Sequence, residues 1–243
     1  MTSYDTSDFD DIRPYTDEEI PAAMKRIVNN RFFPLLAPYV YPDRSLSDVR
    51  ELLLTFKSIH DFQADTMLSV NEQIVKQTID EFTCCGLTRL SPLRPYLYVS
   101  NHRDIMLDAS LLQYYLLTHG FDTSEITFGA NLMQNQLVID IGKCNKMFRV
   151  ERPGGSLREF YKKSVHLSQY LHYTITQQHR SVWIAQRNGR TKDGMDTTDQ
   201  GIIKMFGMAY PEDKIRAISD LHIVPVAVSY EWEPCDILKT LEL

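Results

Sequence analysis

The sequence predicts an α/β fold with a central, mostly parallel sheet flanked by helices and preceded by a small N-terminal helical domain. Two observations carry this prediction. After residue 86, short apolar runs rich in β-favouring residues alternate with longer segments of helical periodicity, as in parallel strands joined by helices. Before residue 86, the apolar positions follow the helical period alone. We therefore expect a disordered acidic tail over 1–16, a helical accessory domain over 17–86 and an α/β domain over 87–243.

Length and composition agree with a folded chain of this kind. A chain of 243 residues is long enough for one large domain with a small extension. Hydrophobic residues make up 43% of it and charged residues 24%, a mixture that excludes fibrous and fully disordered proteins. The chain stops soon after its last expected strand, so truncation of the α/β domain at its C-terminal end stays open.

The N-terminal part is expected to consist of the tail and three helices. Clustered Asp, Ser and Thr residues predict disorder over 1–16. Acidic residues open the first helical pattern, and Ser45 and Asp48 have the spacing of a helix cap before the second. The three patterns cover residues 17–29, 45–59 and 62–82. The apolar segment 32–40 has two open interpretations, a core segment or a contact with lipid.

Strands and helices are expected to alternate in the α/β domain. Apolar runs with β-branched and aromatic residues predict strands at 96–99, 147–150, 181–185 and 222–230. Helical patterns lie between and after them, at 105–118, 131–141, 156–177 and 197–209. Because α/β proteins usually bind ligands at the carboxyl ends of parallel strands, the residues that follow each strand are the candidates for a functional site.

The net charge of −6 is distributed unevenly along the chain. Residues 1–19 carry a net charge of −6 by themselves, and the other 224 residues are balanced. Within that balanced part, residues 143–192 contain eleven basic and two acidic residues, a local net charge of +9. A basic stretch in a neutral body favours a site for an anionic ligand. Since no nucleic-acid-binding motif accompanies it, we expect no nucleic-acid partner.

The cysteines and the apolar runs indicate a cytoplasmic protein. Cys84 and Cys85 are adjacent and form a poor disulfide pair, and no CxxC spacing points to zinc. Reduced thiols fit the cytosol. The acidic N-terminus lacks the apolar region of a secretory signal, and no apolar run approaches the roughly 20 residues that span a bilayer. We expect a cytoplasmic location with peripheral contact at a membrane surface.

His102 is the candidate catalytic base. It stands between an expected strand and an expected helix, and a histidine acts as a general base near neutral pH when a carboxylate fixes its tautomer. Asp104 is placed to cap the helix, whereas Asp108 lies in an apolar helical segment where an ionised carboxylate needs a partner. We favour Asp108 as the partner of His102. Pairing of Asp108 with an arginine elsewhere is the alternative.

Arginines follow two of the expected strands. Arg152 and Arg190 each come shortly after a strand end, and Asn188-Gly189 is a turn that brings backbone N–H groups near a ligand. The planar guanidinium matches the geometry of phosphate oxygens. A solvated positive face is the alternative, but two such loops favour a phosphate site. The spacing of a P-loop is absent.

Four ordered blocks between Ser100 and Tyr230 resemble the glycerolipid acyltransferases, which include glycerol-3-phosphate and lysophosphatidate acyltransferases. The blocks are Asn101-His102, Val150-Glu151-Arg152, Arg187-Asn188-Gly189-Arg190-Thr191 and the proline-containing strand Ile223–Val228. In the family's first block an Asp follows the His after four residues; here Leu107 holds that place and Asp108 comes one residue late. The third block lacks the family's Glu, for which Gln186 is the candidate replacement.

This resemblance implies a fatty acyl transfer in phospholipid synthesis without a covalent enzyme intermediate. His102, oriented by Asp108, is implied as the general base. The donor is an acyl thioester, either acyl-CoA or an acyl carrier protein, and the acceptor is a hydroxyl of a lipid or a glycerol phosphate. No metal and no bound cofactor are required. The implied substrate-binding residues are Arg103, Arg152, Asn188, Gly189, Arg190 and Pro225.

Other functions stay open. A non-catalytic protein that binds anionic lipid through residues 143–192 is one alternative, because the first and third blocks depart from the family pattern. An acyltransferase that acts on a non-phosphorylated lipid acceptor is another. A phosphoester hydrolase would need metal ligands or a nucleophile, and neither constellation is visible in the sequence.

Overall fold

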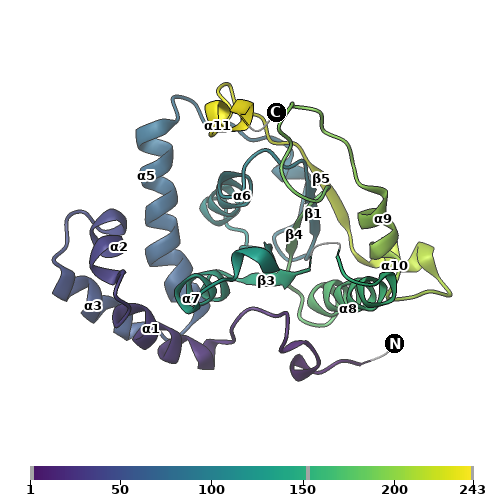
Figure 1. Cartoon of the computed structure of the whole chain (residues 1–243), viewed down its shortest axis with the longest axis horizontal. Coiled ribbons are helices and arrows are strands. Elements are labelled where there is room, and N and C mark those ends of the chain that lie inside the picture. The colour runs from purple at the N-terminus through teal and green to yellow at the C-terminus, as the bar shows by residue number, and fades with distance from the viewer. Residues whose placement is uncertain (1–2, 152–153, 242–243) are drawn as a thin grey trace. The chain divides into compact units, whose positions relative to one another are not determined.

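The structure is a computed structural model that describes residues 3–151 and 154–241 (Figure 1). The chain forms two compact units. The α/β unit contains the described residues of Met1–Phe9, Cys85–Thr127 and Glu151–Leu243, and the helical unit contains Asp10–Cys84 and Phe128–Val150. The division after residue 84 lies close to the boundary expected at residue 86, whereas residues 128–150 belong to the helical unit.

Five strands form one parallel sheet in the order β3-β2-β4-β1-β5. The strands are β1 Leu97–Ser100, β2 Glu125–Gly129, β3 Met147–Val150, β4 Val182–Ala185 and β5 Ile223–Val226. Tyr98 of β1 lies opposite Trp183 of β4 on one side and Val224 of β5 on the other. Strands β1 and β4 each have a strand on both sides, and this buried place suits their continuous apolar sequences. The predicted α/β fold with a central parallel sheet is confirmed.

Helices cover both faces of the sheet within the α/β unit. Figure 1 shows α6 on one side of β1, β4 and β5, and α8, α9 and α10 on the other side. The long helix α8 begins with a capping box of Ser156 and Glu159, and its second half is the buried half. The helices of this unit are α6 Leu107–Thr118, α8 Leu157–Thr176, α9 Gln200–Phe206, α10 Lys214–Asp220 and α11 Asp236–Leu241.

The helical unit has its own apolar core. Buried side chains such as Met24, Phe33, Phe56 and Cys144 belong to one cluster. The Ser45 side chain accepts a hydrogen bond from the Asp48 N–H, as the cap spacing predicts. The helices are α1 Ile20–Val28, α2 Phe33–Val40, α3 Leu46–Thr55, α4 Ile59–Asp61, α5 Leu68–Thr78 and α7 Gln136–Cys144, and a π-helical turn at Phe62–Met67 joins α4 to α5.

Residues 3–16 differ from the disordered tail that their composition predicts. Residues Thr6–Phe9 form a short 3-10 helix, and Phe9 is buried with its ring 5.2 Å from that of Tyr170 and 5.0 Å from that of Tyr173. Ile12 is also buried. The composition is acidic, but these two apolar side chains supply enough buried surface to order the backbone around them.

Strand β2 and helices α10 and α11 were not expected from the sequence. The expected helix over 131–141 lies instead at α7, because the Asn135 side chain accepts the N–H of Val138 and so caps it there. The open segment 32–40 forms α2, which buries Phe33 and Ala37 but leaves Leu35 and Tyr39 exposed. Among the described residues, no helix combines the length and the apolar character needed to cross a membrane.

A buried carboxylate holds the helical unit together at Asp140 of α7. Asp140 is 1% exposed, and its Oδ1 accepts hydrogen bonds from the Tyr15 hydroxyl at 2.7 Å and from a guanidinium nitrogen of Arg26 at 2.7 Å. The Gln136 side-chain amide donates to the same oxygen at 2.9 Å. The carboxylate therefore joins α1, α7 and the segment before α1. Burial and the Asp140 charge raise the pKa of Tyr15 to about 12, so its hydroxyl stays a donor at neutral pH.

We expect Arg26→Ala to lower the free energy of unfolding by about 2 kcal/mol, because it leaves the buried Asp140 carboxylate without its cation. The matched control is Lys76→Ala, which removes an exposed pair with Glu72 and should cost less than about 0.5 kcal/mol. Urea unfolding of both variants measures the two losses. Equal losses would contradict the structural importance of the Asp140 pair.

Candidate active site

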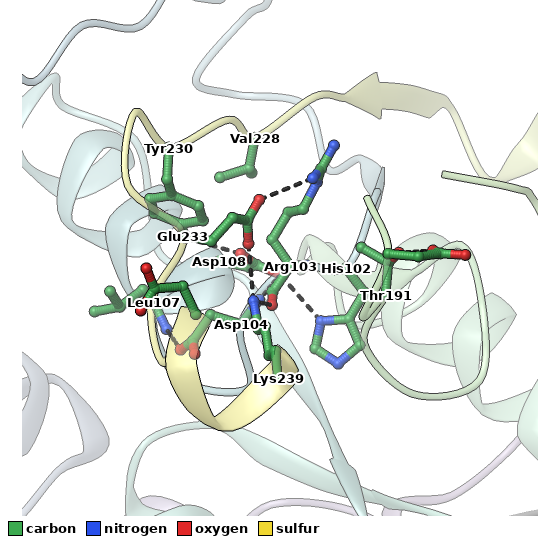
Figure 2. A network of polar contacts seen from close by, with 12 residues as sticks. His102, Arg103, Asp104, Leu107, Asp108, Thr191, Val228, Tyr230, Glu233 and Lys239 are labelled. Carbon is green, nitrogen blue, oxygen red and sulfur yellow. Dashed lines mark hydrogen bonds and ion pairs between the residues drawn. The ribbon is translucent and has the colours of Figure 1, made fainter. Parts of the chain in front are cut away.

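The carboxyl ends of three neighbouring strands lead into the candidate site (Figure 2). Strand β1 lies between β4 and β5, so the segments that follow these three strands begin at the same edge of the sheet. They contribute residues 101–108, 186–199 and 227–239. All of them belong to the α/β unit.

Asp108 is the acceptor around which this site is built. The residue is 1% exposed, and its Oδ2 lies 3.0 Å from Nδ1 of His102. The same oxygen accepts the backbone N–H groups of Arg103 at 2.7 Å and Asp104 at 3.0 Å. Its Oδ1 accepts the hydroxyl of Tyr230 at 2.8 Å. Four donors from two segments of the chain thus satisfy a carboxylate that has no access to water.

The His102 ring is fixed on one side and open on the other. Because Asp108 Oδ2 also accepts two backbone N–H groups, it acts as an acceptor, and the proton of the neutral imidazole is assigned to Nδ1. The ring and that of Trp183 of β4 form a T-shaped pair, with the ring centroids 6.1 Å apart. Among the described residues nothing hydrogen-bonds to Nε2, and the side chain is 14% exposed. Nε2 is therefore the nitrogen that can accept a proton from a ligand.

Asp104 caps the start of α6, as its position in the sequence predicts. Its Oδ1 accepts the backbone N–H groups of Met106 at 2.8 Å and Leu107 at 2.9 Å, at the start of α6. The Asp104 N–H donates to Asp108, and among the described residues no hydrogen bond joins the Asp104 carboxylate to the His102 ring. Of the two carboxylates left open by the sequence, Asp108 is the one that touches the ring. Asp104 shapes the turn that presents the ring.

Arg103 is held by protein carboxylates. Its guanidinium donates to Asp196 at 2.7 Å and to Glu233 at 2.8 Å. The Lys239 ammonium donates to the other Glu233 oxygen at 2.8 Å and to the Arg103 carbonyl at 2.6 Å (Figure 2). The geometry favours Arg103 as a clamp between the loop after β4 and the C-terminal segment, rather than as the substrate ligand that the resemblance implies.

Asn101 ties the His102 loop to the exit of β5. Its side-chain amide donates to the Val228 carbonyl at 2.8 Å and accepts the Val228 N–H at 2.7 Å. The same amide donates to Asp196 at 3.1 Å. This paired contact continues the strand pairing beyond the end of β5. It explains why an amide side chain precedes His102.

The loop after β4 carries three of the predicted substrate-binding residues. Asn188 is exposed, Arg190 is half-buried, and Gly189 has a φ of 76°, a left-handed conformation that favours glycine. The Thr191 N–H donates to the His102 carbonyl at 2.8 Å, which fixes this loop to the backbone of the candidate base. The structure thus brings the predicted turn close to the backbone of His102.

The other two predicted residues are placed differently. Pro225 lies within β5 opposite Val99, on the edge strand of the sheet, where a missing N–H is tolerated. Arg152 lies outside the described residues. The neighbouring block residue Glu151 pairs with Lys163 of α8 at 3.5 Å.

Sequence reasoning did not identify Tyr230, Asp196, Glu233 or Lys239 as parts of this site. Tyr230 follows the last strand by four residues, so its place after a parallel strand was the available signal. Burial and the negative charge of Asp108 raise the pKa of Tyr230, and its hydroxyl therefore stays protonated as a donor. The charged residues Asp196, Glu233 and Lys239 carry no local pattern, because their partner is a loop far away in the sequence.

Comparison of the chain with protein-family models and with curated protein sequences finds no match. Within residues 3–151 and 154–241, no group of three or more His, Cys, Asp or Glu side chains is arranged to hold a metal ion. The candidate site consists of a histidine with a fixed tautomer, a buried carboxylate with four donors, and a glycine turn beside them.

We expect Asp108→Ala and Asp104→Ala to differ in their cost. Asp108→Ala leaves several buried donors without an acceptor and should lower the free energy of unfolding by about 3 kcal/mol or more. Asp104→Ala removes a helix cap and should cost about 1 kcal/mol. Urea unfolding measures both values. A larger loss for Asp104→Ala would show that the carboxylate of Asp108 is not the centre of the network.

Proposed function

We propose that the chain is an O-acyltransferase that moves a fatty acyl group from an acyl thioester to a hydroxyl of a glycerol-phosphate-type acceptor. The observation that carries this proposal is the His102 ring, whose Nδ1 faces the buried Asp108 while Nε2 has no partner among the described residues. This arrangement suits a general base for a hydroxyl group. The four sequence blocks that resemble glycerolipid acyltransferases support the choice of reaction.

In the proposed reaction, His102 Nε2 removes the proton from the acceptor hydroxyl while the hydroxyl oxygen forms a bond to the thioester carbonyl carbon. The carbon–sulfur bond then breaks, and the leaving thiolate takes the proton back from the imidazolium. The products are an ester and a free thiol, and His102 returns to its neutral form. Asp108 stabilises the transient imidazolium and keeps the tautomer fixed, and Tyr230 holds the far oxygen of Asp108.

The acceptor phosphate is proposed to bind at the turn after β4. Gly189 supplies a backbone that a ligand can approach closely, and Arg190 supplies a guanidinium in the same turn. The Thr191 N–H fixes this turn to the carbonyl of His102. A phosphate held there would keep a nearby hydroxyl in reach of Nε2, and such positioning is a large part of the catalysis of a two-substrate reaction.

A second acceptor class is favoured by the charges around the base. The network contains the carboxylates of Asp104, Asp108, Asp196 and Glu233, and its two cations, Arg103 and Lys239, pair with Asp196 and Glu233. This surplus of negative charge repels an anionic acceptor unless the turn at Arg190 compensates it. An acyltransferase that uses a non-phosphorylated lipid hydroxyl is therefore the second candidate.

We expect His102→Ala to lower kcat/KM for acyl transfer by at least about 100-fold, because the reaction loses its general base. The assay is formation of lysophosphatidate or of another ester from labelled acyl-CoA, read by mass spectrometry with a panel of acceptors. His60→Ala, at an exposed histidine of α4, is the control and should keep full activity. Activity of His102→Ala close to that of the control would refute the proposed reaction.

We expect Arg190→Ala to raise KM for glycerol 3-phosphate about tenfold or more, because a charge-assisted hydrogen bond is lost, while KM for acyl-CoA stays unchanged. Lys162→Ala, at an exposed lysine of α8, controls for the loss of one positive charge. If the unmodified protein and the Arg190→Ala variant acylate a non-phosphorylated glycerol monoester equally well, the second acceptor class is the correct one.

A further inference from the structure

Helix α11 exposes its apolar side chains and buries its lysine, the reverse of the usual amphipathic helix. Lys239 is its one buried residue, at 3% exposure, and all six residues of the helix are described. Ile237 is 73% exposed, Leu238 is 59% exposed and Leu241 is 78% exposed. A helix on a soluble surface normally buries its apolar stripe and exposes its lysines. Here the helix is attached by its charged side and turns its apolar side outward.

The attachment of α11 is specific and lies beside the candidate base. The Lys239 ammonium donates to the Arg103 carbonyl at 2.6 Å and to Glu233 at 2.8 Å, and Arg103 is the residue next to His102 (Figure 2). A buried lysine costs free energy unless it is paired, and both of these acceptors satisfy it. The contacts of Lys239 therefore fix which side of α11 faces outward.

Other exposed apolar side chains belong to the two segments that supply the acceptors of Lys239. Ile105 and Met106 follow Arg103 by two and three residues and are 57% and 64% exposed. Trp232 precedes Glu233, the residue that pairs with Arg103 and Lys239, and is 80% exposed. We call the six exposed side chains the apolar rim: Ile105, Met106, Trp232, Ile237, Leu238 and Leu241. Exposed apolar groups gathered in this way mark an interaction surface.

We propose that the apolar rim inserts into the surface of a phospholipid bilayer and thereby sets His102 at the membrane. Three features favour a bilayer over a protein partner. An exposed tryptophan beside aliphatic side chains is typical of the membrane–water boundary. Shallow insertion into a bilayer needs only a short apolar face. The rim also borders the base that, in the proposed function, acts on a lipid hydroxyl.

The charges at the rim define the kind of membrane. Glu231 and Asp236 are exposed within the same segment, so the rim offers no cationic attraction for anionic headgroups. Insertion through apolar contacts alone should therefore occur on neutral phosphatidylcholine and should persist at high salt, because screening weakens only charge–charge attraction. Binding through the basic stretch 143–192 would behave in the opposite way.

A second exposed apolar face provides the matched control. In the helical unit, Leu35, Leu36 and Tyr39 of α2 and Phe32 at its N-cap have a helical spacing and are all exposed. Arg31 lies over the Phe32 ring, with its guanidinium carbon 4.6 Å from the ring centroid. This face is also apolar, but it belongs to the helical unit and not to the unit that carries His102. It therefore separates a specific role of the rim from general stickiness.

The two tryptophans of the chain make the test direct. Trp183 is 4% exposed, whereas Trp232 stands in the rim, so a shift of tryptophan emission on membrane binding reports on Trp232. The experiment mixes the full chain with phosphatidylcholine vesicles whose acyl chains carry bromine, a quencher of tryptophan. It compares the unmodified chain with Ile237→Ser/Leu238→Ser and with Leu35→Ser/Tyr39→Ser, at low salt and in 1 M salt. All four substituted side chains are exposed, so folding is expected to survive and is checked by circular dichroism.

We expect a blue shift and bromine quenching of Trp232 emission, equal binding at both salt concentrations, and binding at least tenfold weaker for Ile237→Ser/Leu238→Ser alone. Absence of binding to the vesicles would overturn the proposal. So would a loss confined to the α2 variant, or binding that requires anionic lipid and low salt. Self-association of the lipid-free chain that Ile237→Ser/Leu238→Ser abolishes would identify a second copy as the occupant instead. None of these outcomes depends on acyl transfer, which the assay of His102→Ala tests separately.

Discussion

The candidate site depends on one buried carboxylate. Asp108 is shielded from water, and an ionised carboxylate in that place is stable only if protein donors replace the lost water. Two backbone N–H groups, the Tyr230 hydroxyl and the His102 ring provide this replacement. The donors stabilise Asp108, and Asp108 fixes the turn of residues 102–104, the tautomer of His102 and the exit of β5 at Tyr230.

Ion pairs of Arg103 hold together the chain segments that carry these donors. Arg103 lies in the middle of the turn, and its two carboxylate partners, Asp196 and Glu233, come from the loop after β4 and from the segment after β5. The turn is therefore held from both neighbouring strand exits as well as by Asp108. Because the Arg103 guanidinium is paired with carboxylates of the protein, it offers little charge to a ligand.

The sequence could predict the parts of this arrangement that depend on local chemistry. Apolar periodicity identified four of the five strands, and the pairing of Asp108 with His102 followed from the cost of an acid in an apolar helix. Strand β2 escaped because its sequence, from Glu125 to Gly129, mixes polar and apolar residues. The clamp of Arg103 escaped because its partners are 93 and 130 residues away in the chain, and only the folded sheet brings them together.

The basic stretch 143–192 shows why a charge count along the chain overstates a binding site. The fold distributes its residues over different parts of the molecule. Arg180 precedes β4 and pairs with Glu125 at 3.7 Å, so this pair lies at the amino ends of the strands, away from the candidate site. Lys163 of α8 pairs with Glu151. Arg190, in contrast, follows β4 at the carboxyl edge of the sheet, in the turn that Thr191 fixes to His102. A parallel sheet gives its two ends different chemistry, so the position of a charge relative to the strand decides whether it can serve a ligand at His102.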